Sequence, residues 1–230
     1  MKLFKSYYVF SPALRIWHWV NFVAIAVLFV TGLYIGNPFF SGPHGKEATF
    51  ATTMAFIRFL HFSAGYILLA AFLFRIATAP FNKGDRLVIP AFWREEFWQR
   101  FKATLEEYLL FKEHEPMIRN PLARTAYFFF YLLLVFMLLT GFSIYGLSNP
   151  GGFWDTLTGW VVWSLGGEFQ ARAWHHWVAW IIMLFFVVHL YFVVREDVFR
   201  RNGEVSSMVS GVKFFDREPV DADELKEEER

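Results

Sequence analysis

Residues 172–189 read RAWHHWVAWIIMLFFVVH, and this stretch decides the fold. It is apolar over most of its length, contains no acidic residue, and carries His175, His176 and His189. About 20 apolar residues are enough to cross the ~30 Å hydrocarbon core of a bilayer as a helix. A histidine within such a helix is costly, so the first hypothesis for it is a functional role. The stretch therefore predicts a membrane helix that carries a site.

The whole chain has the composition of a membrane protein. Of its 230 residues, 56% are apolar and 19% are charged, against roughly 45–50% and 25% in soluble domains. The formal net charge of +1 argues against a general polyanion binder, and we expect no nucleic acid partner. Four stretches are long and apolar enough to span a bilayer: Ile16–Ile35, Met54–Ala79, Ala123–Leu147 and Ala173–Val194. The sequence thus predicts an all-α, integral membrane four-helix bundle.

The distribution of Lys and Arg predicts the orientation of these helices. The amino-terminal segment, the second loop and the tail are rich in Lys and Arg, whereas Ser148–Ala171 has none. Because positive loops stay on the cytoplasmic side, both termini are expected in the cytoplasm. The protein is then a multi-pass protein of the inner (cytoplasmic) membrane, with the first and third loops facing outward.

Three segments outside the membrane helices have a character of their own. Ala91–Phe111 spaces aromatic residues three or four apart, which predicts an amphipathic helix on the inner surface. The third loop contains Trp154, Trp160 and Trp163, which suit either an interfacial aromatic belt or a surface that docks a partner. We divide the chain into a transmembrane domain, 1–200, and a polar, acidic cytoplasmic tail, 201–230, and expect disorder after Glu204.

Depth in the membrane pairs the histidines. His18 and His189 fall at the inner level of their helices, and His61 falls at the outer level with His175. His189 follows His175 by fourteen residues, which is about 40° short of four turns and a rise of ~21 Å. Both rings therefore point to one side of the helix. His176 misses that side by about 140°, so His175 is the expected ligand.

Two histidines at each level suit a six-coordinate haem iron, which transfers electrons and leaves no open position for substrate. The chain has no Cys, which excludes thiolate zinc sites, iron–sulfur clusters and covalent haem attachment. A zinc or di-metal site needs three or four ligands, usually with carboxylates, and the helix interiors contain none. We therefore predict two haem b groups, each with two histidine ligands.

An arginine precedes three of these histidines by three residues, on the same face of the helix. Guanidinium groups bind carboxylates well, so these arginines are expected to bind haem propionates, although arginine is also common at the ends of membrane helices. The pairs are Arg15 with His18, Arg58 with His61, and Arg172 with His175.

Residues 15–32, RIWHWVNFVAIAVLFVTG, and residues 172–189 resemble the two signature segments of the b-type cytochrome subunit of membrane-bound nickel–iron hydrogenases. The second segment departs from that pattern at Trp177, where an aliphatic residue is usual. The related subunit of formate dehydrogenases shares the four-helix, two-haem plan. The resemblance covers the whole chain in helix number, loop pattern and histidine placement.

The resemblance implies an electron-transfer subunit that is not itself an enzyme. Such a subunit anchors the small and large hydrogenase subunits on the outer face, receives electrons from an iron–sulfur cluster and passes them to quinone. His61 and His175 would then hold the outer haem, and His18 and His189 the inner one. Surrounding lipid is the other expected partner, and a higher oligomer is left open.

A quinone site is expected at the inner surface, where electrons would leave the inner haem. Asn120 and His114 are the candidate hydrogen-bond donors to a quinone carbonyl. Asn120 has an alternative role as the amino-terminal cap of a helix that begins with Pro121. Three other functions stay open: a formate dehydrogenase anchor, a transporter that relays protons through histidines, and an anchor that has lost one haem.

Overall fold

The computed structural model describes residues 4–38, 47–81, 90–110, 117–118 and 120–221. The chain divides into two compact units, each assembled from separate parts of the sequence. Unit 1 comprises Met1–Ile16, Arg75–Leu132 and Phe185–Arg230. Unit 2 comprises Trp17–Phe74 and Leu133–Leu184.

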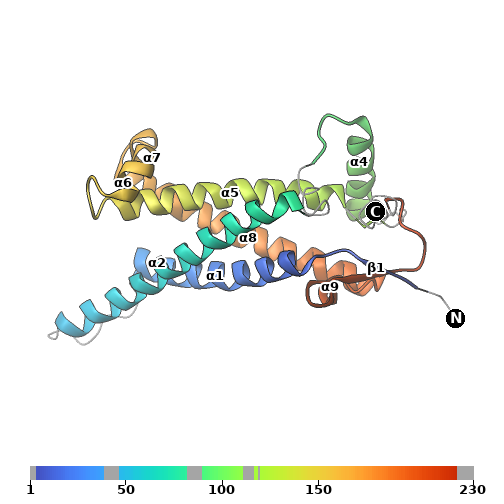
Figure 1. Cartoon of the computed structure of the whole chain (residues 1–230), viewed down its shortest axis with the longest axis horizontal. Coiled ribbons are helices and arrows are strands. Elements are labelled where there is room, and N and C mark those ends of the chain that lie inside the picture. Colours follow the sequence, from blue (N-terminus) through green and yellow to red (C-terminus); the bar gives the residue numbers. More distant parts are fainter. Residues whose placement is uncertain (1–3, 39–46, 82–89, 111–116, 119, 222–230) are drawn as a thin grey trace. The chain divides into compact units, whose positions relative to one another are not determined.

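Four helices are long and apolar enough to cross a membrane, which confirms the predicted all-α membrane class (Figure 1). They are α1 (Pro12–Gly36), α2 (Glu47–Thr78), α5 (Pro121–Gly146) and α8 (Glu168–Arg200). In the most apolar part of each helix, at most 22% of the residues are buried within the chain. Their large apolar side chains are thus exposed, as expected for helices that face lipid.

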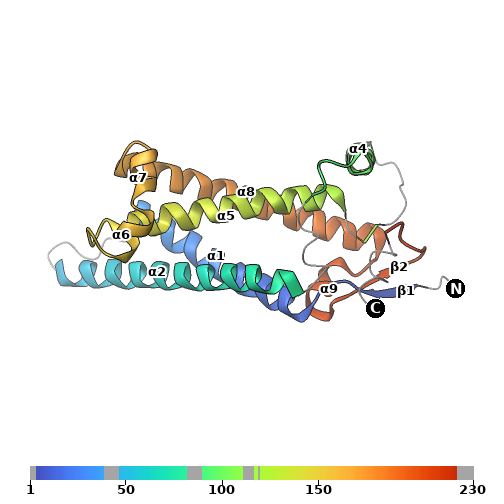
Figure 2. The same cartoon turned by 45° about the horizontal axis from the view of Figure 1, so that its top comes forward.

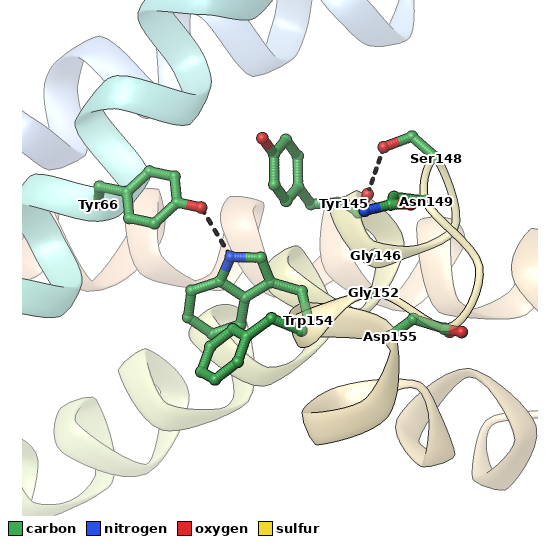
Figure 3. Close-up of a pocket in the computed structure, with 9 residues that line it drawn as sticks. Tyr66, Tyr145, Gly146, Ser148, Asn149, Gly152, Trp154 and Asp155 are labelled. Atoms are coloured by element: carbon green, nitrogen blue, oxygen red, sulfur yellow. Dashed lines mark hydrogen bonds between the residues drawn. The ribbon is translucent and has the colours of Figure 1, made fainter.

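In unit 2, two short helices connect α5 to α8, namely α6 (Phe153–Thr158) and α7 (Trp160–Ser164) (Figures 1 and 2). Trp154 holds this connection in place, because its ring stacks on Phe142 at 3.9 Å and its indole N–H donates to the Tyr66 hydroxyl at 2.6 Å. Figure 3 shows Tyr66 pointing toward Trp154 beside a pocket of about 200 Å³. The third loop is therefore folded back onto α2 and α5.

Unit 1 contains α4 (Glu95–Leu110), which confirms the helix predicted within Ala91–Phe111. A short 3-10 helix, η1 (Ala79–Phe81), follows α2. Phe97, Thr104 and Glu107 are buried on α4, whereas Trp98 is exposed. The buried residues of α4 therefore include polar as well as apolar side chains.

The expectation of disorder after Glu204 is wrong for residues 204–215. They form α9 (Glu204–Ser210) and β2 (Val212–Phe215), and β2 pairs antiparallel with β1 (Lys5–Tyr8) (Figure 2). The buried Lys213 ammonium lies 2.6 Å from a Glu204 carboxylate oxygen, and the Arg15 guanidinium donates to the Val209 carbonyl. Pairing with a strand about 200 residues away in sequence orders this part of the tail.

Gly211 lies just before β2 and packs closely against Tyr8 and Phe10. Its φ is +85°, and a Cβ there would lie 2.7 Å from Tyr8 Cε2 and 2.8 Å from the Phe10 carbonyl oxygen. We predict that Gly211→Ala destabilises this pairing by about 1–3 kcal/mol and speeds amide hydrogen exchange in β1 and β2. Gly151→Ala is the control, since its φ is also positive but no described atom lies within 4 Å. Equal exchange in β1 and β2 for wild type and Gly211→Ala would contradict this prediction.

Candidate functional site

The structure places the four predicted ligands on three of the membrane helices. His18 lies on α1, His61 on α2, and His175 and His189 on α8, and all four are half-buried. His61 and His175 both belong to unit 2. The predicted outer pair therefore lies within one compact unit.

His61 is held by a Thr-Gly dipeptide on α1. The Thr31 hydroxyl oxygen lies 2.9 Å from His61 Nδ1 and 2.6 Å from the Val27 carbonyl oxygen. The ring also packs on the next residue, because a Cβ at Gly32 would lie 3.3 Å from His61 Cε1. Thr31 is buried, with 5% of its surface exposed.

His175 is held in the same way by α5. The Thr140 hydroxyl oxygen lies 2.8 Å from His175 Nδ1 and 2.8 Å from the Phe136 carbonyl oxygen. A Cβ at Gly141 would lie 3.2 Å from His175 Cε1. Thr140 has no exposed surface. Thr31–Gly32 on α1 and Thr140–Gly141 on α5 thus contact His61 and His175 in the same way, through ring atoms Nδ1 and Cε1. Each of these dipeptides is called a Thr-Gly seat below.

His176 lies in different surroundings from its neighbour. It is exposed, and a Cβ at Gly36 on α1 would lie 2.7 Å from His176 Cε1. His176 thus packs on α1, whereas His175 is seated on α5. This difference supports the choice of His175 as the ligand.

The outer pair fits a haem with two axial histidines. Since Nδ1 of each ring is engaged by threonine, Nε2 is the nitrogen that remains for iron. Beside His61 on α2, no described atom lies within 4 Å of a Cβ built on Gly65, so a flat macrocycle has room to approach the helix. Among the described residues, no group of three or more His, Cys, Asp or Glu side chains could hold a metal ion. A pair of imidazoles is the ligand set that the site presents.

The three predicted propionate partners have distinct environments. Arg172 forms an ion pair with Glu168 at 2.7 Å, so it already binds a carboxylate in the structure. Arg58 is exposed on α2, and Arg15 donates to the carbonyl of Val209. The propionate role of these arginines stays a prediction.

His18 and His189 belong to different units, so their pairing rests on depth along the helices. The His18 ring meets Trp19 edge to face, with centroids 5.2 Å apart. The His189 ring stacks on Phe185, with centroids 5.9 Å apart and planes inclined by 5°. Each predicted inner ligand is therefore supported by an aromatic ring of its own unit.

The predicted quinone contact Asn120 is a helix cap. Its Oδ1 accepts from the backbone N–H groups of Leu122 and Ala123 at 2.9 and 3.2 Å, and its amide donates to the Tyr108 hydroxyl at 2.8 Å. Burial, and next the Glu196 carboxylate, raise the pKa of the Tyr108 phenol above its usual range, so it stays protonated. The quinone role of Asn120 stays a prediction. His114 lies outside the described residues.

Thr31 and Thr140 were not among the predicted site residues, although each begins a Thr-Gly dipeptide near the end of an apolar stretch. The tryptophans of the third loop differ in their contacts. Trp154 donates a hydrogen bond to Tyr66 within the chain, whereas Trp160 and Trp163 are 60% and 83% exposed. A docking surface on this loop would therefore use the latter two.

Two histidines in one unit of a membrane protein, each with one ring nitrogen left for a metal, fit a membrane cytochrome of the b type. The pattern of the family described as prokaryotic cytochrome b561 matches residues 9–211. The chain belongs to this family and is a b-type cytochrome.

Relatives with similar lengths support this assignment. The chain is 42% identical over 221 residues to the probable Ni/Fe-hydrogenase B-type cytochrome subunit of Cupriavidus necator, which covers 93% of this chain and 89% of the relative. It is 40% identical to the corresponding protein of Rhodobacter capsulatus, covering 91% and 82%. The probable Ni/Fe-hydrogenase 1 B-type cytochrome subunit of Escherichia coli is 34% identical, covering 90% and 91%.

The two neighbouring histidines of α8 can be separated by substitution. We predict that His175→Ala lowers the haem content measured as pyridine haemochrome, because it removes the imidazole seated on Thr140. His176→Ala should keep the wild-type haem content and serves as the matched control. Full haem content in His175→Ala, with loss in His176→Ala, would assign the ligand to His176.

Proposed function

We propose that this chain is a dihaem cytochrome b that carries electrons from a nickel–iron hydrogenase to the quinone pool. The observation that carries the proposal is the outer histidine pair, in which His61 and His175 each present Nε2 from an equivalent Thr-Gly seat. The names of the relatives suggest the electron donor. These proteins are named as probable Ni/Fe-hydrogenase B-type cytochrome subunits, and the chain matches them over most of their length.

In this proposal, His61 and His175 hold the outer haem, and His18 and His189 hold the inner one. When bound with two axial histidines, a haem iron takes up and releases one electron at a time. Histidines from the chain would hold the iron on both sides, which would keep oxygen and other small ligands off the metal. The fourteen-residue spacing of His175 and His189 corresponds to a rise of about 21 Å along an α-helix, and this rise would set the distance between the haem levels.

The surrounding residues perform two further tasks. Arg15, Arg58 and Arg172 bind propionates at the haem edges, and Arg172 would exchange its pairing with Glu168 for a propionate. The apolar walls of the helices exclude water and so limit the solvent reorganisation that accompanies electron transfer. The protein thereby holds two redox groups at fixed places in the membrane.

The orientation of the chain in the membrane follows from the distribution of charge. The positive-inside rule places both termini and α4 at the cytoplasmic face of the inner membrane. The connection that carries α6 and α7 then faces outward and contacts the small and large hydrogenase subunits, with Trp160 and Trp163 among its exposed residues. Quinone accepts electrons at the inner level, near His18 and His189.

The haem stoichiometry tests this proposal. We predict two haem b groups per chain in the purified protein, and a loss of one haem in each of His18→Ala, His61→Ala and His189→Ala. The physical reason is that a haem retained by a single axial bond dissociates more readily than one held by two. One haem in the wild type would contradict the two-haem proposal, and full content in both His18→Ala and His189→Ala would exclude these two residues as haem ligands.

The role of Asn120 is tested by two conservative variants. Asn120→Asp keeps the capping oxygen but removes the amide donor, and Asn120→Ser keeps a shorter cap. If quinone binds here, we predict normal haem content and hydrogen-dependent haem reduction, with quinone reduction lowered about tenfold or more. Normal quinone reduction in both variants would limit Asn120 to its role as the cap of α5.

A further inference from the structure

Each Thr-Gly seat fixes which nitrogen of its histidine carries the proton. The Thr31 hydroxyl has one proton and lies 2.6 Å from the Val27 carbonyl oxygen, which can only accept. The hydroxyl must therefore donate to this carbonyl. Its oxygen is left to accept, so His61 Nδ1, at 2.9 Å, is the donor, and the Leu28 backbone is a further hydrogen-bond partner of this ring.

The same reasoning applies to the second seat. The Thr140 hydroxyl donates to the Phe136 carbonyl at 2.8 Å and accepts from His175 Nδ1 at 2.8 Å. Both histidines are therefore Nδ1–H tautomers with a lone pair on Nε2. This is the form in which an imidazole binds iron through Nε2.

The glycines fix the positions of the rings. A Cβ at Gly32 would lie 3.3 Å from His61 Cε1, and one at Gly141 would lie 3.2 Å from His175 Cε1. Any other residue at either position would push the ring away by a few tenths of an ångström. Since Cε1 lies between the two ring nitrogens, that shift would also displace Nε2.

We propose that Thr31–Gly32 and Thr140–Gly141 are a matched pair of positioning elements that set the redox potential of one and the same haem. This inference rests on the proposed function, because it takes His61 and His175 as the two ligands of the outer haem. Thr31 and Thr140 act through the histidines and do not bind the iron.

The sign of the effect follows from charge. A hydroxyl that already donates to a carbonyl is a stronger acceptor, because linked hydrogen bonds polarise one another. Donation from Nδ1–H shifts electron density toward Nε2 and makes the imidazole a stronger base. Ferric iron carries one more positive charge than ferrous iron, so it gains more from a basic ligand. Each threonine therefore lowers the midpoint potential of the outer haem.

The test is a redox titration of the purified protein with Thr31→Val or Thr140→Val, followed by haem absorbance. Valine keeps the shape of threonine but cannot accept a hydrogen bond. We expect each variant to keep two haems and to raise one of the two midpoint potentials. About a tenfold change in the relative affinities for ferric and ferrous iron corresponds to ~59 mV. Both variants should move the same potential and leave the other unchanged.

Serine variants and a third threonine provide the controls. Thr31→Ser and Thr140→Ser keep the hydroxyl and should titrate like the wild type. Thr125 on α5 donates to the Pro121 carbonyl at 2.9 Å, so Thr125→Val removes the same kind of backbone bond away from His61 and His175. It should leave the outer-haem potential unchanged.

The outcomes separate this inference from the proposed function. Two haems with unshifted potentials in both valine variants would overturn the inference, as would shifts of two different haems. If a valine variant loses one haem, the serine variant at the same position distinguishes the two explanations. A serine variant with two haems and wild-type potentials supports the role of the hydroxyl, whereas a serine variant that also lacks one haem overturns it. A wild-type protein without haem would instead overturn the proposed function.

Discussion

An imidazole inside a membrane helix must satisfy two ring nitrogens where no water is available. An unsatisfied polar group in hydrocarbon costs several kcal/mol, so each nitrogen requires a partner supplied by the protein or by a bound group. In the outer pair, a threonine hydroxyl satisfies Nδ1 of both His61 and His175. The nitrogen that remains on each ring, Nε2, is the one suited to a metal. The rest of the site can be understood as the structure needed to meet this requirement twice.

The four membrane helices divide this work among them. In the proposed arrangement, α2 and α8 supply the outer ligands, while α1 and α5 supply the seats on which those ligands rest. The helix α1 also carries His18 near its start. In this arrangement α1 would supply a ligand to the inner haem through His18 and would position the outer ligand His61 through Thr31–Gly32. The helix α8 supplies a ligand to each level. A shift of either helix along its axis would then change both haem sites together.

The sequence predicts the parts of this arrangement that depend on length and period. Four apolar runs predicted four membrane helices, and three- and four-residue spacing predicted α4. The seats were missed because threonine in an apolar helix usually bonds only to its own backbone, and its contact with a histidine depends on a second helix. The β1–β2 pair was missed because its strands are about 200 residues apart, and the acidic end of the tail hid a short apolar strand. Six- and five-residue helices such as α6 and α7 are too short to show a period.

The central claim is that paired histidines are the only axial ligands of two haems. Near-infrared magnetic circular dichroism of the oxidised protein, combined with electron paramagnetic resonance, reports axial ligands directly. The account predicts two low-spin ferric haems per chain, both with the charge-transfer band of bis-histidine coordination. A band of histidine–methionine ligation, or a high-spin signal that integrates to a whole haem, would contradict it.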